Sequence, residues 1–89
     1  MKRLHLLIRG KVQDVSYRYF TKKKAEEFNI KGWVRNNPDG SVEVMADGEE
    51  DTLKKFLEEC RKGPSSADVE SVDVEWLEPE HEFEQFVMY

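Results

Sequence analysis

The sequence predicts an α+β domain in which two helices cover one face of a mainly antiparallel sheet. Three observations support this fold class. Hydrophobic residues alternate in several stretches, they recur at helical spacing in two others, and the stretches follow one another in the order β-α-β-β-α-β with a short strand after them. The 89 residues, 38% of them hydrophobic, suffice for one small core. We therefore expect a single domain over residues 1–89.

The first strand and the first helix follow from a change of hydrophobic period. Within residues 3–9, apolar side chains occupy alternate positions, as in a strand with one buried face. Within residues 16–29, apolar side chains recur at spacings of three and five, which places them on one stripe of a helix. Ser16 is a candidate N-cap, and Asn29 or Gly32 can supply the left-handed residue that ends the helix.

The middle of the chain predicts a hairpin followed by a second helix. The hairpin covers residues 32–48, and its turn at residues 37–40 reads Asn-Pro-Asp-Gly, in which proline and glycine set the backbone angles of a tight turn. The second helix opens at Gly48 and stops at Gly63. Its apolar residues have the i, i+3, i+4, i+7 spacing of one helical face: Leu53, Phe56, Leu57 and Cys60.

The last part of the chain is again extended, with strands expected over residues 69–76 and 83–89. The parity of the apolar positions changes within the first of these stretches, which predicts a β-bulge near residues 70–71. Trp33 and Trp76 are expected to pack in the sheet.

The net charge of −5 conceals an uneven distribution along the chain. The first 35 residues hold ten basic and three acidic side chains, and the rest of the chain holds four basic and sixteen acidic ones. An acidic protein of this kind is a poor general binder of nucleic acid, but its basic first third is suited to one small anion. An RNA-recognition domain has the same order of elements, but residues 41–47 have no aromatic side chain and two acids, so we expect no nucleic-acid partner.

Other classes are excluded by what the sequence lacks. No stretch approaches the roughly 18 apolar residues of a membrane span, so we expect no membrane partner. The single cysteine, Cys60, excludes an internal disulfide and a multi-cysteine metal site. His5 and His81 have no other ligands at metal-binding spacing, so no metal site is predicted. Together with the absence of a targeting segment, these features favour a cytoplasmic protein.

Two segments carry the residues suited to chemistry. Residues 10–16 form a loop that enters the first helix, and Arg18 follows in its first turn. A helix N-terminus offers unpaired backbone N–H groups, and arginine adds a planar fork of donors suited to phosphate. A glycine before a helix is equally typical of a simple turn. Asn36 can either shape the hairpin by a hydrogen bond or position a water molecule.

Taken together, these segments resemble the acylphosphatase family. Residues 10–18 read Gly-Lys-Val-Gln-Asp-Val-Ser-Tyr-Arg and resemble the signature G-x-V-Q-G-V-x-[FY]-R. Residues 32–36, Gly-Trp-Val-Arg-Asn, followed by Asp-Gly-Ser-Val at residues 39–42 and by Gly48, are similar to the family's second signature. The last seven residues, 83–89, are similar to its closing strand. The resemblance spans essentially the whole chain and implies the family's ferredoxin-like α/β sandwich.

The resemblance implies that the chain hydrolyses a small acyl phosphate to a carboxylate and inorganic phosphate without metal, cofactor or covalent intermediate. Arg18 and the loop amides would hold the phosphoryl group, and Asn36 would orient the attacking water, so Arg18 and Asn36 are the expected catalytic residues. The expected substrate-binding residues form one run: Lys11, Val12, Gln13, Asp14, Val15, Ser16, Tyr17 and Arg18. We expect the enzyme to be a monomer.

Asp14 departs from the family pattern, which has glycine at this position. Aspartate tolerates a left-handed backbone better than most residues, so its charge is the larger concern. At about 5 Å and an effective dielectric constant near 20, each like charge on the substrate costs up to about 3 kcal/mol, or roughly a hundredfold in rate. Asp14 can also pair with Arg18 or point outward. Two hypotheses remain: a weakened acylphosphatase, or an anion-binding module with little or no turnover.

Overall fold

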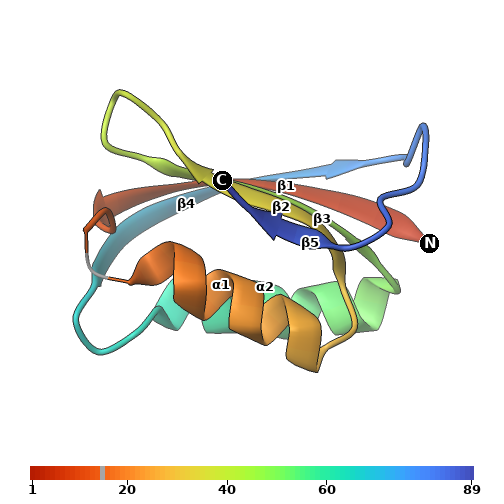
Figure 1. Ribbon diagram of the computed structural model, residues 1–89, viewed down its shortest axis with the longest axis horizontal. Helices are drawn as coiled ribbons and strands as arrows, with labels where there is room; N and C mark the ends of the chain where they lie inside the picture. Colours follow the sequence, from red (N-terminus) through yellow and green to blue (C-terminus); the bar gives the residue numbers. More distant parts are fainter. Residues whose placement is uncertain (15) are drawn as a thin grey trace.

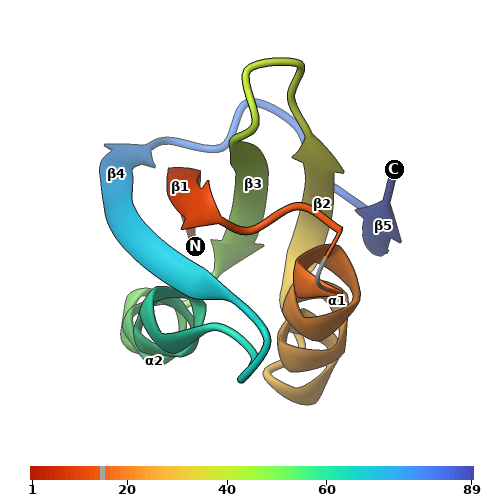
Figure 2. The ribbon, with the colours of Figure 1, turned by 90° about the vertical axis from the view of Figure 1, so that its left-hand side faces the viewer.

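The computed structural model describes residues 1–14 and 16–89. Its strands lie in the order β4-β1-β3-β2-β5 in a single sheet, and both helices lie on one face of that sheet (Figure 1, Figure 2). This arrangement is the predicted ferredoxin-like α/β sandwich. The elements are, in chain order, β1 (Lys2–Lys11), α1 (Tyr17–Glu27), β2 (Lys31–Asn36), β3 (Val42–Gly48), α2 (Glu50–Lys62), β4 (Asp68–Leu77) and β5 (Phe86–Met88).

The sheet is antiparallel except at one edge. β1 pairs antiparallel with both β3 and β4, β3 pairs antiparallel with β2, and β5 runs parallel to β2. The helices cover the face that carries the apolar residues of β1 and β3, so the core lies between helices and sheet. The predicted helical stripe of α2 is buried in this core, and the fully buried side chains include Leu4, Leu6, Ile8, Val42, Val44, Leu53, Phe56 and Cys60.

The ends of the helices depart from the prediction in two places and agree with it in a third. Ser16 precedes α1 but has a left-handed backbone, with φ of 64°, and its side chain makes no capping hydrogen bond. The capping prediction is therefore wrong, because a side-chain cap requires an extended backbone at that residue. Asn29, with φ of 60°, is the predicted left-handed residue after α1. Gly48 ends β3 instead of opening a helix, and α2 begins at Glu50.

The predicted bulge in β4 is confirmed. Arg9 pairs with Ser71 whereas Gly10 pairs with Val69, so Glu70 is the extra residue on β4. A Cβ atom on Gly10 would lie 2.2 Å from the carbonyl oxygen of Asp68, and the φ of Gly10 is 131°. Only glycine fits this close approach. The bulge and Gly10 thus fix the point at which the chain turns from β1 toward α1.

The last strand and one tryptophan differ from the sequence prediction. β5 covers three residues instead of residues 83–89, because the Phe83 ring leaves the sheet and lies beneath the Arg3 guanidinium, 4.6 Å from ring centroid to Cζ. Trp76 was expected to pack in the sheet but is 41% exposed. β4 is an edge strand, so its helix-facing side chains are only partly covered.

A buried ion pair joins β1 to β3 and also holds the segment between β4 and β5. Arg3 Nε and Nη2 donate to the two carboxylate oxygens of Asp47 at 2.7 and 2.9 Å, and both side chains are less than 10% exposed. Arg3 Nη2 also donates to the main-chain oxygen of His81 at 2.7 Å. One guanidinium therefore joins β1, β3 and the segment that leads to β5.

Candidate active site

The structure brings Arg18 and Asn36 to one hollow at the start of α1. Arg18 lies in the first turn of the helix, and Asn36 is the last residue of β2. We call this depression the loop hollow. The residues that line it are Val12, Asp14, Ser16, Tyr17, Arg18, Tyr19, Asn36 and Met88.

Tyr17 anchors the start of α1 in the core. Its ring is 1% exposed, and its hydroxyl donates a hydrogen bond of 2.6 Å to the main-chain oxygen of Cys60 in α2. Burial raises the pKa of Tyr17 far above its usual value, so the hydroxyl stays a neutral donor. Cys60 is itself buried, as predicted, and burial raises the pKa of its thiol to about 12. The anchor fixes the direction in which the next residue, Arg18, leaves the helix.

Gln13 holds the loop against the β2–β3 turn. Its Nε2 donates to the main-chain oxygens of Asn37, at 2.8 Å, and Ser41, at 2.9 Å. The turn itself is closed by Asp39 Oδ1, which accepts from the backbone N–H and the hydroxyl of Ser41. The side chain of Gln13 therefore has a structural role. Its consequence for the site is that the loop stays beside Asn36.

Asn36, a residue that lines the hollow, has an unpaired side-chain acceptor. Within residues 1–14 and 16–89, its Oδ1 is the single buried side-chain nitrogen or oxygen atom without a hydrogen-bond partner. Leaving a buried acceptor unpaired costs about 1–3 kcal/mol, so native structures retain such atoms mainly where a ligand or water completes them. The sequence motif predicts the residue but not this orientation of its amide.

Arg18 has one contact and several free donors. Its Nη1 donates to the main-chain oxygen of Tyr89, just after β5. No Asp or Glu side chain among the described residues forms an ion pair with Arg18. A guanidinium has five N–H donors, and the remaining ones are available to an anion in the hollow.

Asp14 lies at the rim of the loop hollow without an ion pair to Arg18. Its backbone is left-handed, with φ of 60°, as expected for the position where the family pattern has glycine, and its side chain is exposed. Of the two alternatives for Asp14, pairing with Arg18 is not seen among the described residues, and the exposed side chain agrees with the outward orientation. Of the other predicted residues, Lys11 is exposed at the end of β1 and does not line the hollow. Val15 lies outside the described residues.

The structure adds site residues that the sequence did not indicate. A second depression, here called the aromatic hollow, shares Arg18 and Asn36 with the loop hollow. The residues that line it are Arg18, Trp33, Arg35, Asn36 and Tyr89. Trp33 and Arg35 belong to the second sequence motif, so the motif could have indicated them as site residues. Met88 and Tyr89 enter the site only because β5 pairs with β2.

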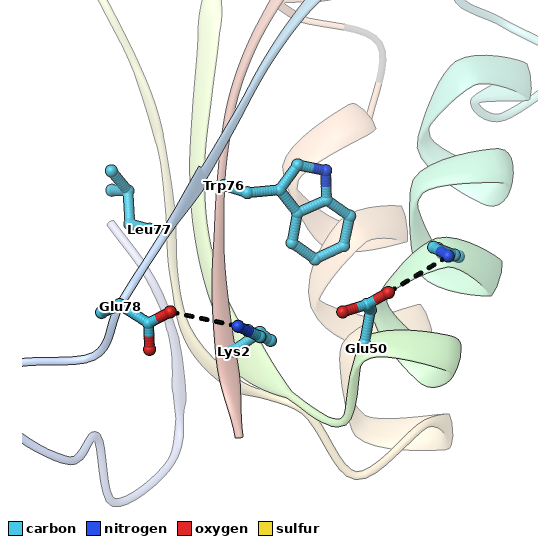
Figure 3. A pocket seen from close by; sticks show the side chains of 6 residues that line it. Lys2, Glu50, Trp76, Leu77 and Glu78 are labelled. Carbon is cyan, nitrogen blue, oxygen red and sulfur yellow. Dashed lines mark hydrogen bonds and ion pairs between the residues drawn. The ribbon is translucent and has the colours of Figure 1, made fainter.

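A third hollow lies at the opposite edge of the sheet, beside β4 (Figure 3). Its charged side chains neutralise each other: Lys2 pairs with Glu78 at 3.1 Å, and Lys54 pairs with Glu50 at 3.2 Å. Trp76 forms its apolar wall. Unlike Arg18 in the loop hollow, both cations among the described residues that line it are paired with a glutamate.

The described residues include no helix long and apolar enough to cross a membrane. They also hold no group of three or more His, Cys, Asp or Glu side chains placed to bind a metal ion.

A hollow at a helix N-terminus lined by an arginine without an Asp or Glu partner is typical of a domain that receives a small anion. A family model described as acylphosphatase matches residues 4–88, and the chain therefore belongs to the acylphosphatase family. Its activity is accordingly the hydrolysis of acyl phosphates. An anion-binding module without turnover is not favoured, because the relatives carry the name of the enzyme.

The relatives match nearly the whole chain. An acylphosphatase of Chloroflexus aurantiacus is 47% identical over 77 residues, which is 86% of this chain and 84% of that protein. An acylphosphatase of Methylococcus capsulatus is 43% identical over 88 residues, which is 99% of this chain and 96% of that protein. The crystal structure of acylphosphatase from Bacillus subtilis superposes with a TM-score of 0.97 at 30% identity, covering 100% of this chain and 99% of that one.

Proposed function

We propose that the loop hollow is where this acylphosphatase hydrolyses its substrate, with Arg18 and Asn36 as the catalytic residues. The observation that carries the proposal is that Asn36, whose Oδ1 has no hydrogen-bond partner, lines the same hollow as Arg18, which has no Asp or Glu partner among the described residues. The amide oxygen accepts a hydrogen bond from the attacking water, and the guanidinium holds the phosphoryl oxygens. The backbone amides of the loop and of the first turn of α1 are proposed to complete the phosphate site, and the proposed residues are Lys11, Val12, Gln13, Asp14, Val15, Ser16, Tyr17 and Arg18.

The reaction requires little acid–base catalysis from these residues. The water oxygen forms a bond to phosphorus while the bond from phosphorus to the carboxylate oxygen breaks, and the carboxylate leaves with its electron pair. A carboxylate is a good leaving group, so positioning the water and stabilising the charge on the phosphoryl oxygens are sufficient. An amide suits the first task because it does not titrate, and an arginine suits the second because it stays protonated. The proposed mechanism uses no metal or cofactor.

We expect Asn36→Ala to lower kcat for benzoyl phosphate about a hundredfold while KM changes less than threefold. Without the amide oxygen the water is no longer held in line, and a poorly placed reactant costs about this much. The phosphate contacts made by Arg18 are unaffected. The measurement is the steady-state rate of hydrolysis in a buffer that contains a metal chelator.

Asn37→Ala is the matched control, because Asn37 is a neighbouring amide whose Nδ2 contacts Ser41 Oγ at 3.1 Å in the turn and does not line the hollow. Its kcat should stay within twofold of the wild type. The proposal fails if the two alanine variants lose equal activity, since Asn36 would then act only through the hairpin.

Asp14 is expected to weaken the enzyme without abolishing its activity. Because its side chain is exposed, water screens its charge. The remaining Coulomb repulsion at about 5 Å should lower kcat/KM roughly fivefold. Asp14→Asn removes the charge and keeps a residue that tolerates the left-handed backbone. We expect its kcat/KM to rise about fivefold at low ionic strength, with a smaller rise in high salt.

Asp14→Gly separates charge from backbone conformation. If charge is the cause, glycine and asparagine raise the rate equally. A rate that rises only with glycine would assign the effect to the backbone, and unchanged rates in both variants would show that Asp14 does not influence the substrate.

We further propose that residues 1–89 act as one domain, as a cytoplasmic monomer that takes a small acyl phosphate and binds no nucleic acid. All site residues of the proposal come from one chain. Cys60 is a free, buried thiol, as suits a reducing compartment. The open face of β3 presents Glu43 and Met45 in place of the aromatic side chains that stack on RNA bases.

A further inference from the structure

The aromatic hollow begins where the loop hollow ends. Both depressions contain Arg18 and Asn36, so a ligand held by these two residues can extend from one into the other. If the phosphoryl group occupies the loop hollow, the acyl group must leave it on the side that is open. The aromatic hollow provides that opening.

The opening exists because β5 stops before β2 does. The last hydrogen bond between them runs from the backbone N–H of Tyr89 to the oxygen of Val34 at 2.9 Å, and β2 continues to Asn36. Successive side chains on a strand point to opposite faces, so Asn36 faces the helices with Val34, whereas Trp33 and Arg35 face the other side. The aromatic hollow therefore crosses the edge of the sheet from the helix face to the open face.

Its walls are flat and largely apolar. The rings of Trp33 and Tyr89 meet edge to face with centroids 6.5 Å apart, and the guanidinium carbon of Arg35 lies 4.9 Å from the Trp33 ring centroid. Tyr89 is 67% exposed, so its ring has a free face. Such surfaces stack favourably on another planar group.

The charge of Arg35 is already compensated. Its Nη2 donates to Glu43 Oε1 at 2.8 Å. Burial tends to raise the pKa of Glu43, but hydrogen bonds from His5 and Arg35 bring the pKa below its usual value, so the carboxylate stays ionised. Arg35 therefore has no uncompensated charge for a second anionic group on the substrate. This favours an uncharged acyl group.

We propose that Trp33, Arg35 and Tyr89 form the subsite for the acyl group of the substrate, and that it prefers a flat, uncharged aromatic acyl group to a short aliphatic one. The inference rests on the proposed placement of the phosphoryl group between Arg18 and Asn36. On cleavage of the bond from phosphorus to the acyl oxygen, water supplies the new oxygen on phosphorus and the aromatic carboxylate departs through this subsite. Trp33 and Tyr89 thereby determine specificity without taking part in the chemical step.

The test compares benzoyl phosphate with acetyl phosphate, which share the reacting bond and differ in the acyl group. The ratio of their kcat/KM values, benzoyl over acetyl, should be at least about ten in the wild type. Tyr89→Ala and Trp33→Ala should each lower this ratio about fivefold to tenfold, the size expected for one lost stacking contact, and the change should lie mainly in KM for benzoyl phosphate. If Trp33→Ala does not fold by circular dichroism, Trp33→Leu replaces it.

Trp76→Ala is the matched control, since Trp76 is a partly exposed tryptophan on the opposite edge strand and should leave the ratio unchanged. A ratio that stays at the wild-type value in both Tyr89→Ala and the Trp33 variant would overturn the subsite, as would an equal loss for both substrates. Arg18→Ala separates this failure from that of the proposed function. If Arg18→Ala loses the hydrolysis of both substrates, the proposed phosphoryl site stands even when the subsite fails. If Arg18→Ala retains activity, the proposed phosphoryl site is itself refuted.

Discussion

Replacing Arg18 by alanine should reduce kcat/KM for benzoyl phosphate about a thousandfold. Arg18 is the one arginine among the described residues that lines the loop hollow, and no Asp or Glu side chain among them pairs with it. Removing a charged donor aimed at the oxygens of a reacting group costs about 10²- to 10³-fold in comparable sites, and arginines that stabilise phosphoryl transfer reach higher values. Arg18 is half-buried and its side chain donates a hydrogen bond to the Tyr89 oxygen but forms no buried ion pair, so the unfolding midpoint should change little.

Two further variants make this result specific. Arg18→Lys keeps the charge but loses the planar fork, so we expect it to recover only part of the lost activity. Arg61→Ala removes the same charge from the exposed face of α2 and should leave kcat/KM within twofold. A loss in Arg61→Ala as large as that in Arg18→Ala would indicate an effect of net charge instead of a contact with the phosphoryl group.

The largest expected effect on stability comes from Arg3→Ala. This substitution leaves Asp47 as a buried carboxylate without its partner and removes the contacts of Arg3 to the His81 oxygen and the Phe83 ring. Breaking a buried ion pair by deleting one partner costs about 3–5 kcal/mol in the free energy of unfolding. Urea denaturation at pH 7 measures it. Because Arg3 lies at the far end of β1 from Gly10 and the loop, kcat of the folded fraction should remain close to the wild type.

The neighbouring pair Lys2–Glu78 provides the control. It is exposed on both sides, and Lys2→Ala should cost less than about 1 kcal/mol. Equal destabilisation by Lys2→Ala and Arg3→Ala would contradict the argument, since burial would then play no part. Asp47→Asn offers an independent check, because it removes the same pair from the other side while keeping the shape of the side chain.

The sequence predicted those parts of the fold that depend on local periodicity. The alternation in residues 3–9 and the stripe from Leu53 to Cys60 each correspond to a buried face, and the change of parity near Glu70 located the bulge. What failed depended on contacts distant in the sequence. Trp76 is exposed because its strand lies at an edge, and Phe83 leaves the last strand because Arg3 lies above it.

The same distinction holds for the site. The motifs indicated Arg18 and Asn36 individually, and the structure places both at one hollow. No local pattern indicated that Tyr89 would border it, since that depends on the parallel pairing of β5 with β2 and on where β5 ends. Gln13 fits the motif, yet its side chain proves to be committed to the turn at Asn37. Side-chain orientation within a motif is set by partners that the motif does not contain.

The separate roles of Arg18 and Asn36 are tested most directly by titrating inorganic phosphate into the wild type, Arg18→Ala and Asn36→Ala. Phosphate binding is followed by NMR through the amide resonances of the loop. If Arg18 binds the phosphoryl oxygens and Asn36 only orients water, Asn36→Ala should bind phosphate within about twofold of the wild type although its turnover is lost. Arg18→Ala should bind at least about tenfold more weakly. Equal binding by Arg18→Ala and the wild type, or loss of binding in Asn36→Ala with turnover intact, would contradict the proposed site.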